Sequence, residues 1–349
     1  MTRNNLTKNE KKVLYGLINY PDLNNRELAD KIKVKLSTLT SIKRRLSDKN
    51  FYHSLTVPML NCLGCELLAV IHTRFNPVIP LEERVKTTKS TIEVFEEIFF
   101  SVGEQEKGFS LSLSTDYSNI SRINEIRTET FGNLGLLEEE TPDEVIFPFE
   151  TSKIIKFFDF GEIIREVFNI EDKNNDNKYK YLNNIYNVDL SDKEKKVYRA
   201  VVENPGFTNS DIGDIVGLSR HTVSRMKKNF SKQGLLKRIV LPNLEKLGFE
   251  ILAFYHIKFN PHTHPGEKDI DFLNSPSTVF FATKKFEAVI ISIHPTYQDY
   301  KEDKMKKIRF LRENDFISYT PVVSKYRVDR MVVIKNFDFV PLVEKVLNI

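Results

Sequence analysis

Basic, hydroxyl and imidazole side chains gather in one short stretch of the second half of the chain. Between Ser219 and Arg238 there are seven lysines and arginines and no acid. A one-sided block of positive charge suits the neutralisation of phosphate groups. Arginine, serine, threonine and histidine also form hydrogen bonds with the edges of bases. The residues predicted to make such contacts are Arg220, His221, Thr222, Ser224, Arg225, Lys227 and Lys228.

A stretch in the first half of the chain follows the same plan. In "KLSTLTSIKRRLSDKN" (35–50), Leu39, Ile42 and Leu46 have helical spacing and are expected to face the core, as are Val223, Met226 and Phe230 in the later stretch. The residues left for the outer face are Lys35, Ser37, Thr38, Thr40, Ser41, Lys43, Arg44 and Arg45. The opposing interpretation is a solvated basic helix in a domain that is structural or docks a protein.

Two cysteines form the other pattern that could carry chemistry. Cys62 and Cys65 make a lone C-x-x-C, and a metal site would need two more ligands. We interpret Cys65 as a core residue, with a redox role as the open alternative. The stretches G-x-x-x-x-G-K-[ST], G-x-S-x-G and H-E-x-x-H are absent. We therefore expect no catalytic residue, no metal, no cofactor and no enzyme activity.

Length and composition bound the class of protein. The 349 residues are enough for two or more domains, and a 40% apolar content can form a sizeable core. The net charge of +4 excludes a wholly basic protein and permits a local basic face. The chain has no run of 18 apolar residues and no signal-peptide core at its N-terminus. We expect a cytoplasmic protein without membrane contact.

The elements around the later basic stretch predict a winged helix-turn-helix. A first helix runs from Asp192 to Val202 behind Ser191, and "SDIGDIVG" is a short second helix ended by Gly217. The basic helix follows, capped by Ser219 and closed by Gly234. After it, "LLKRIVLPNLEKLG" is expected to form a small strand pair. The first half repeats this order, with Lys33 in the place of Gly217.

The repeat extends over almost the whole chain. With Leu6 placed over Leu190, "LGCELLAVIHTRFNP" (63–77) meets "LGFEILAFYHIKFNP" (247–261) without a gap. Roughly 22 of about 72 aligned pairs are identical, which indicates a duplicated module. The segments "FDFGEIIREVFNI" (158–170) and "FDFVPLVEKVLNI" (337–349) end the two copies. Below, the first copy is residues 6–170 and the second copy residues 190–349.

The rest of each copy predicts a second small domain. In the first copy, "ELLAVIHTRF", "FEEIFFSV", "GFSLSLST" and "EVIFPFETSKIIKF" have the composition of strands, and the first should be buried on both faces. Helical patterns lie at 80–94 and 117–132, and a terminal helix is expected from Gly161 to Phe168. The order βαββαβ is the ferredoxin-like plan.

The predicted fold class is α+β, a tandem duplication of a winged helix-turn-helix and a ferredoxin-like sensor domain in an intramolecular pseudo-dimer. The predicted segments are a winged helix-turn-helix at 1–62, a sensor domain at 63–170, a polar linker at 171–189, a second winged helix-turn-helix at 190–246 and a second sensor domain at 247–349.

At this point the chain resembles a known family. "GLSRHTVSRMKKNFSKQGLLKR", followed by "LPNLEKLG" and a βαββαβ unit, is similar to the Lrp/AsnC family of transcription regulators. The resemblance implies that Arg220, Thr222, Ser224 and Arg225 read DNA, with Lys35, Ser37, Thr38, Thr40 and Ser41 as their counterparts. Members of the family are single modules that dimerise through their sensor sheets. Small metabolites bind them at sensor interfaces.

The resemblance thus implies a sequence-specific regulator in which two winged helices read one double-stranded DNA site. It also implies a small-molecule effector at the sensor domains, and further self-association is open. The first copy keeps Gly103 and Gly108 around the sensor turn where the second copy has "TKKFEA", so the effector site is expected in the first copy. Because the outward residues of the two basic helices differ, the DNA site should be asymmetric.

Two other functions remain as alternatives. A winged-helix adaptor would bind proteins of the transcription machinery in place of DNA. Siroheme decarboxylases are similar in having the same two-domain module, and the resemblance implies a sensor strand rich in histidine, tyrosine and arginine. "FFSVGEQEKGFSLSLS" and "FFATKKFEAVIISI" do not have that composition.

Overall fold

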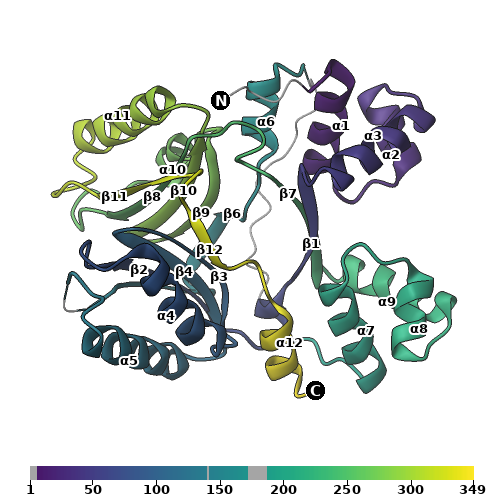
Figure 1. Ribbon diagram of the computed structural model, residues 1–349, viewed down its shortest axis with the longest axis horizontal. Coiled ribbons are helices and arrows are strands. Elements are labelled where there is room, and N and C mark those ends of the chain that lie inside the picture. Colours follow the sequence, from purple (N-terminus) through teal and green to yellow (C-terminus); the bar gives the residue numbers. More distant parts are fainter. Residues whose placement is uncertain (1–5, 140, 172–186) are drawn as a thin grey trace. The chain divides into compact units, whose positions relative to one another are not determined.

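The chain folds into two compact units, each of which combines segments of both sequence copies (Figure 1). The computed structural model describes residues 6–139, 141–171 and 187–349. The described residues of the first unit are 6–55, 154–171 and 238–329, and those of the second unit are 56–139, 141–153, 187–237 and 330–349. Most of the predicted linker, with Tyr181 and Ile185, lies outside the described residues.

A three-helix domain begins the first unit. Its helices are α1 (Lys8–Asn19), α2 (Asn25–Ile32) and α3 (Leu36–Asp48). Capping boxes start the first two, because Thr7 and Asn24 accept from the backbone of the first turn while Glu10 and Glu27 bond back to the caps. The predicted apolar stripe Leu39, Ile42 and Leu46 is buried. The sequence pattern therefore orients α3 as predicted.

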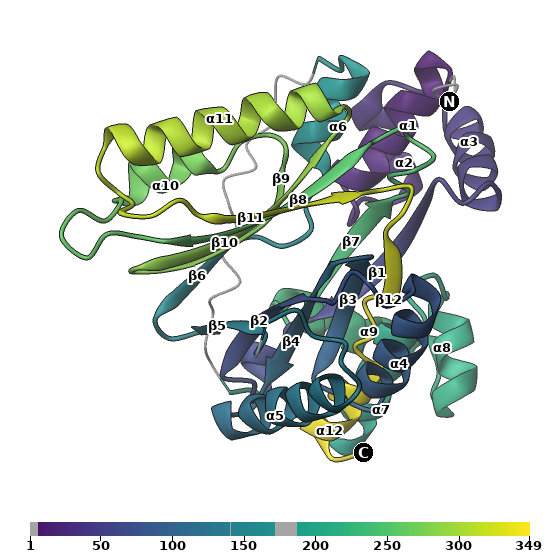
Figure 2. The same ribbon diagram turned by 60° about the vertical axis from the view of Figure 1, so that its left-hand side comes forward.

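The sensor sheet of the first unit has the strand order β11-β8-β10-β9-β6. Its strands are β8 (Ile251–Lys258), β9 (Thr278–Lys284), β10 (Glu287–His294), β11 (Val322–Arg327) and β6 (Ser152–Lys156). Helices α10 (Glu267–Leu273) and α11 (Tyr297–Glu313) pack on one face (Figure 2). The second copy therefore forms a βαββαβ unit, and one strand of the first copy is added at its edge.

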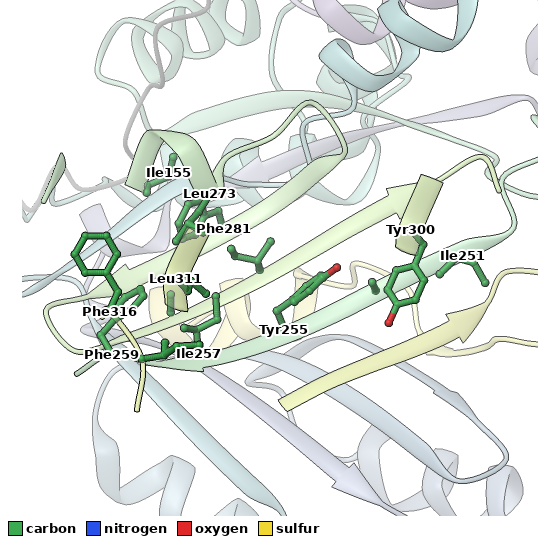
Figure 3. Packing of buried hydrophobic residues seen from close by; sticks show 14 residues of the cluster. Ile155, Ile251, Tyr255, Ile257, Phe259, Leu273, Phe281, Tyr300, Leu311 and Phe316 are labelled. Atoms are coloured by element: carbon green, nitrogen blue, oxygen red, sulfur yellow. The ribbon is translucent and has the colours of Figure 1, made fainter. Parts of the chain in front are cut away.

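The core of this unit lies between its sheet and these helices (Figure 3). Alternate residues of β8, namely Ile251, Ala253, Tyr255 and Ile257, point into the core, as the period of two of a strand requires. The opposite face of the same strand is buried as well. Ile155, which β6 brings from the first copy, is part of the same cluster.

The second unit has the same parts with the copies reversed. Its sheet order is β12-β3-β4-β2-β5, with β2 (Leu67–Arg74), β3 (Ile98–Glu104), β4 (Lys107–Ser114), β5 (Asp143–Pro148) and β12 (Val332–Lys335). Its helices are α4 (Leu81–Glu93), α5 (Tyr117–Asn133), α7 (Asp192–Glu203), α8 (Asn209–Val216), α9 (Arg220–Lys232) and the terminal α12 (Val340–Leu347), with a short 3-10 turn, η1 (Leu60–Cys62). Ile334 of β12 joins the core of β2, α4 and α5. The mixed α+β fold with ferredoxin-like sheets is confirmed.

The prediction that each basic helix is followed by its own pair of strands is wrong. One strand follows each three-helix domain, β1 (Tyr52–Pro58) in the first copy and β7 (Leu236–Pro242) in the second, and the two form one two-stranded sheet. Its ends are held by Asn243 N–H to Phe51 O at 2.8 Å and Met59 N–H to Leu235 O at 2.9 Å. Each strand ends at a proline, and "NLEKLG" turns the chain towards β8, so no hairpin forms.

The exchange of β6 and β12 also differs from the predicted segments. The expected sensor segments 63–170 and 247–349 each end in a strand that belongs to the sheet of the other copy. The sequence analysis expected a single extended stretch at 144–157, whereas the structure has two strands there, β5 and β6. The sequence carries no signal of which sheet edge β6 joins. The predicted terminal helix is found as α6 (Gly161–Phe168), and its counterpart is α12 (Val340–Leu347).

The FDF stretches are the turns between these strands and helices. Their first phenylalanines, Phe158 and Phe337, have left-handed backbone angles φ of 47° and 49°. In the second unit, Asp338 N–H donates to Phe99 O at 2.9 Å, and the Asp338 carboxylate accepts from the first turn of α12. The Phe339 ring stacks on Phe99 with centroids 4.8 Å apart. The turn thus fixes the terminal helix to strand β3.

The terminal helices pack against the first helices of the three-helix domains. In the second unit, Arg199 Nε of α7 donates to Glu344 of α12 at 2.8 Å, and Lys195 Nζ donates to Leu347 O at 2.7 Å. In the first unit, α6 packs on α1, and Lys11 lies over the Phe168 ring. Each terminal helix therefore connects a sensor sheet to a three-helix domain. Among the described helices, none is long and apolar enough to cross a membrane.

The aromatic stack of the FDF turn should be a major source of stability. Phe339→Ala is expected to lower the free energy of unfolding by about 3–5 kcal/mol, because it removes a buried ring from a packed site. Phe339→Leu should cost less, since most of the volume is kept. Urea denaturation followed by circular dichroism measures both. Phe207→Ala, at a ring 46% exposed in a turn, is the control and should change little. Equal effects at both positions would contradict the assigned role of the turn.

Candidate nucleic-acid interface

The turn before each basic helix requires a left-handed residue. Gly217 between α8 and α9 has a φ of 68°, and Lys33 between α2 and α3 has a φ of 55°. Glycine adopts this region without penalty, whereas a residue with a Cβ is strained there. The helix-turn-helix geometry is therefore kept in the first copy in spite of the missing glycine.

A close backbone approach distinguishes the turn of the second copy. A Cβ on Gly213 would lie 2.5 Å from the carbonyl oxygen of Leu218, so only glycine fits. Leu218 N–H donates to Gly213 O at 2.9 Å, which ends α8 against the start of α9. The first copy has Ala29 at the equivalent position, where Val34 N–H donates to Ala29 O at 3.0 Å.

Helix α9 presents an open basic face. Val223 and Phe230 are fully buried, with the Phe230 ring edge-on to Tyr198, and Met226 is half-buried. The predicted outward residues divide into an exposed set, Arg220, His221, Arg225 and Lys228, and a half-buried set, Thr222, Ser224 and Lys227. Within the described residues, the exposed set makes no hydrogen bond or ion pair. These side chains are therefore available to an external partner.

The start of α9 is held by its cap. Ser219 Oγ accepts from Thr222 N–H at 3.2 Å and lies 3.0 Å from the Thr222 hydroxyl. This bond fixes the first turn of the helix and satisfies one of its backbone donors. Lys35, at the equivalent position of α3, makes no such cap.

Helix α3 has the same position in its three-helix domain as α9, but Lys43, Arg44 and Arg45 form hydrogen bonds or ion pairs within the protein. Arg45 holds Glu10 of α1 through Nη2 at 2.9 Å and Nε at 3.0 Å. Arg44 pairs with Asp48 one turn later at 3.7 Å. Lys43 Nζ donates to Asn25 at 3.1 Å, and its burial, followed by the charge of Arg238, lowers the pKa of Lys43.

The hydroxyl-bearing residues of α3 remain on its outer side. Lys35, Ser37, Thr40 and Ser41 are exposed and Thr38 is half-buried, although the Thr40 hydroxyl donates to Leu36 O at 2.9 Å. Asp48 adds an acid where α9 has Lys232. The two helices therefore offer different surfaces. One carries unengaged arginine and lysine, and the other carries hydroxyls and partly paired cations.

The sensor domains contain buried charges that the sequence analysis missed. In the first unit, Lys307 is 2% exposed and its Nζ lies 2.5 and 2.6 Å from the two Asp303 oxygens. In the second unit, Arg127 is also 2% exposed, and its Nη1 donates to Ser110 Oγ at 2.9 Å. The spacing of four between Asp303 and Lys307 is a signal of an ion pair on one helix face. The signal for Arg127 is its place in the buried stripe of α5, whose other members, Ile120, Ile123 and Phe131, are apolar.

The cysteine pair has the surroundings of a core site. Cys62 and Cys65 are both buried free thiols. Burial, followed by the charge of Glu97, raises the pKa of Cys65 to about 12, so the reactive thiolate does not form near neutral pH. Within the described residues, no group of three or more histidine, cysteine or acidic side chains is arranged to hold a metal ion.

Comparison with known proteins gives two kinds of similarity. A family model described as a Crp-like helix-turn-helix domain matches residues 188–248. No curated protein matches the chain. Among solved structures, the siroheme decarboxylase NirDL is 10% identical with a TM-score of 0.54, and the match covers 97% of this chain and 98% of that one. NirDL in complex with an iron-uroporphyrin III analogue is also 10% identical, with a TM-score of 0.51 and coverages of 98% and 99%.

A further similarity covers part of the chain. An AsnC family transcriptional regulator from Agrobacterium tumefaciens is 16% identical with a TM-score of 0.30, over 40% of this chain and 89% of that one. At these identities the NirDL matches establish a common fold and no common activity. They do overturn the expectation that the chain is not an enzyme, because an enzyme has the same fold along its whole length. The fold and the absent motifs gave no ground for that exclusion.

Adding a glycine at Lys33 and removing the glycine at Gly217 should change the free energy of unfolding in opposite directions. Lys33→Gly is expected to raise the free energy of unfolding by about 0.5–1 kcal/mol, because the left-handed strain is relieved. Gly217→Ala should lower it by about 1–2 kcal/mol for the converse reason. Urea denaturation measures both. Asp30→Gly, within the helical part of α2, is the control and should destabilise. A loss of stability in Lys33→Gly would show that the turn is not strained.

Proposed function

We propose that the chain is a sequence-specific DNA-binding transcription regulator whose two helix-turn-helix domains read one double-stranded DNA site. The observation that carries the proposal is the exposed face of α9, on which Arg220, Arg225 and Lys228 have no partner among the described residues. The helix-turn-helix match at 188–248 supports the same domain. A third helix of this kind lies in the major groove with its first residues at the base edges.

The individual roles follow from the position of each residue along its helix. In α9 the proposed base-reading side chains are Arg220, His221, Thr222, Ser224 and Arg225, and the proposed phosphate contacts are Lys227 and Lys228. In α3 they are Lys35, Ser37, Thr38, Thr40 and Ser41, with Lys43, Arg44 and Arg45 towards the backbone. Because Arg45 is paired with Glu10, its contribution to DNA binding should be smaller than that of Arg225. The stronger half of the interface is thus expected at α9.

One chain is proposed to act as an intramolecular pseudo-dimer. Support comes from the composition of the units, since each contains one three-helix domain and one sensor sheet drawn from opposite copies. A homodimer would present two identical recognition helices, whereas α3 and α9 carry different outward residues. An asymmetric DNA site follows. A small-molecule effector at the sensor domains and further self-association are part of the same proposal.

Two other functions are open to test. The full-length similarity of fold to NirDL favours a tetrapyrrole-modifying enzyme as the second candidate. The adaptor function would use the same exposed helices to bind proteins, and a pull-down run in parallel with a gel shift separates it from DNA binding.

Arg225→Ala should weaken DNA binding without altering stability. If Arg225 reads a base, the variant is expected to lose about 1–3 kcal/mol of binding free energy at one base pair. If Arg225 contacts phosphate, the slope of log K against log salt concentration should become smaller in magnitude by about 0.9. Fluorescence anisotropy on a site selected from a random DNA library, repeated over a salt series, measures both. Arg309→Ala removes an equally exposed charge from α11 and is the control. Equal affinity and salt slope for Arg225→Ala and wild type would contradict the proposed helix.

The enzyme alternative makes a separate spectroscopic prediction. If the chain shares the ligand class of NirDL, titration of iron-uroporphyrin III into the purified protein should give a saturable shift of the tetrapyrrole absorbance band. The shift would be insensitive to Arg225→Ala, because that residue belongs to the other domain of its unit. A linear, unsaturated absorbance change would contradict tetrapyrrole binding. A saturable shift together with no selected DNA site would favour the enzyme over the regulator.

A further inference from the structure

The two sensor domains bury a cation at the same place. Helices α5 and α11 each have 17 residues, and their sequences align with an offset of 180. Arg127 of α5 and Lys307 of α11 therefore occupy equivalent positions, and both are 2% exposed. A buried charge is costly unless it is paired. The two copies meet this cost in different ways.

In the first unit, the buried Lys307 is paired with a carboxylate of its own helix. Asp303 lies one helical turn before Lys307, and the Lys307 ammonium contacts both of its oxygens and also Ser275 Oγ at 2.7 Å. Ser275 Oγ donates in turn to Asp303 at 2.9 Å. The ammonium and the carboxylate are thus neutralised and hydrogen-bonded within the core.

In the second unit no acid takes this place. The residue equivalent to Asp303 is Ile123, which is buried. The Arg127 guanidinium donates from Nη1 to Ser110 Oγ, and its Nε has no hydrogen-bond partner. Among the described residues, no carboxylate contacts it. Burial lowers the pKa of Arg127 to about 10, so the group is still charged at neutral pH.

Polar groups surround Arg127 on the face of the sheet that α4 and α5 cover. Strand pairing aligns Ser110 with Ile71 and Ser112 with Ala69, and Ala69 belongs to the core under these helices. The hydroxyl oxygens of Ser112 and Thr73, and of Thr88 on α4, are buried without partners. The equivalent positions of Ser110 and Thr73 in the second copy are Ile290 and Ile257, both in an apolar core.

A second guanidinium lies at the same sheet. Arg84 of α4 is fully buried, with its Nη1 close enough to Gly103 that an added Cβ would meet it at 3.3 Å. Gly103 is two residues from Ser101, which pairs with Ser110 across β3 and β4. The first-copy sensor therefore has two buried guanidinium groups, and at Thr73 and Ser110 it has hydroxyl groups where the second-copy sensor has isoleucine.

We propose that Arg127, together with the buried hydroxyl groups that β2, β4 and α4 place on this face of the sheet, binds a small carboxylate, the anion that Arg127 lacks. The Nε and Nη2 edge of a guanidinium matches the two oxygens of a carboxylate, with parallel charge-assisted hydrogen bonds. Thr73, Thr88 and Ser112 supply hydroxyls for the rest of the ligand. This site deepens the proposed effector function by naming the ligand class, and its test does not use DNA.

The test is thermal unfolding of the full chain with acetate as the probe, at constant ionic strength balanced by sodium fluoride. Acetate should raise the unfolding temperature saturably, by about 5–10 °C at 100 times its Kd, because it binds the folded state. A parallel titration with chloride tests the class of anion. No shift with acetate, or an equal shift with chloride, would overturn the proposed carboxylate site.

Matched variants connect the shift to Arg127. Ile123→Asp gives the first copy the acid that the second copy has at Asp303, so it should raise the unfolding temperature without acetate and abolish the response to it. Arg127→Leu removes the charge and should also abolish the response. Arg122→Ala, at an exposed position of the same helix, should respond like the wild type. An acetate shift that persists in Arg127→Leu would overturn the assignment.

Discussion

The pairing of exchanged strands is the constraint on which the rest of the structure depends. Strand β12 of the second copy completes the sheet of the first, and β6 of the first copy completes the sheet of the second. One edge strand of each βαββαβ unit, β3 or β9, is thereby paired, so its backbone groups are not left at an exposed edge. Neither copy alone contains a complete compact unit.

The exchange also determines what the FDF segments do. Phe337, which has a left-handed backbone conformation, lies in the turn after β12. The ring of Phe339 stacks on Phe99 of β3, and α12 is bonded to α7. Strand β3 is thus connected through packed and hydrogen-bonded groups to the helix-turn-helix of the same unit.

The two halves of the chain differ at matching positions. In α3, Arg45 is bonded to Glu10 of α1 and Lys43 to Asn25 of α2. In α9, Arg220, Arg225 and Lys228 are exposed. In the sensor domains, Asp303 lies one helical turn before Lys307, whereas Ile123 lies at the equivalent place before Arg127. Such differences are not possible between identical subunits, since a change in one appears in both.

The sequence was sufficient for much of the fold, because periodicity and caps are local. The terminal helix at Gly161–Phe168 and the buried stripe of α3 follow from spacing alone. The pairing of β1 with β7 and the exchange of β6 and β12 could not be predicted, because any two apolar strands satisfy the same pattern. For the candidate site, exposure of Arg225 follows from its position on the helix. The engagement of Arg45 depends on Glu10, 35 residues away, and only the tertiary structure reveals it.

The central claim is that both helix-turn-helix domains of one chain bind one asymmetric DNA site. Selection from a random duplex library, followed by hydroxyl-radical footprinting of the selected DNA, tests it most directly. The account predicts one chain per duplex and two protected half-sites of different sequence, spaced by a multiple of about 10 base pairs. A single protected half-site, two identical half-sites or the absence of a selected sequence would contradict it.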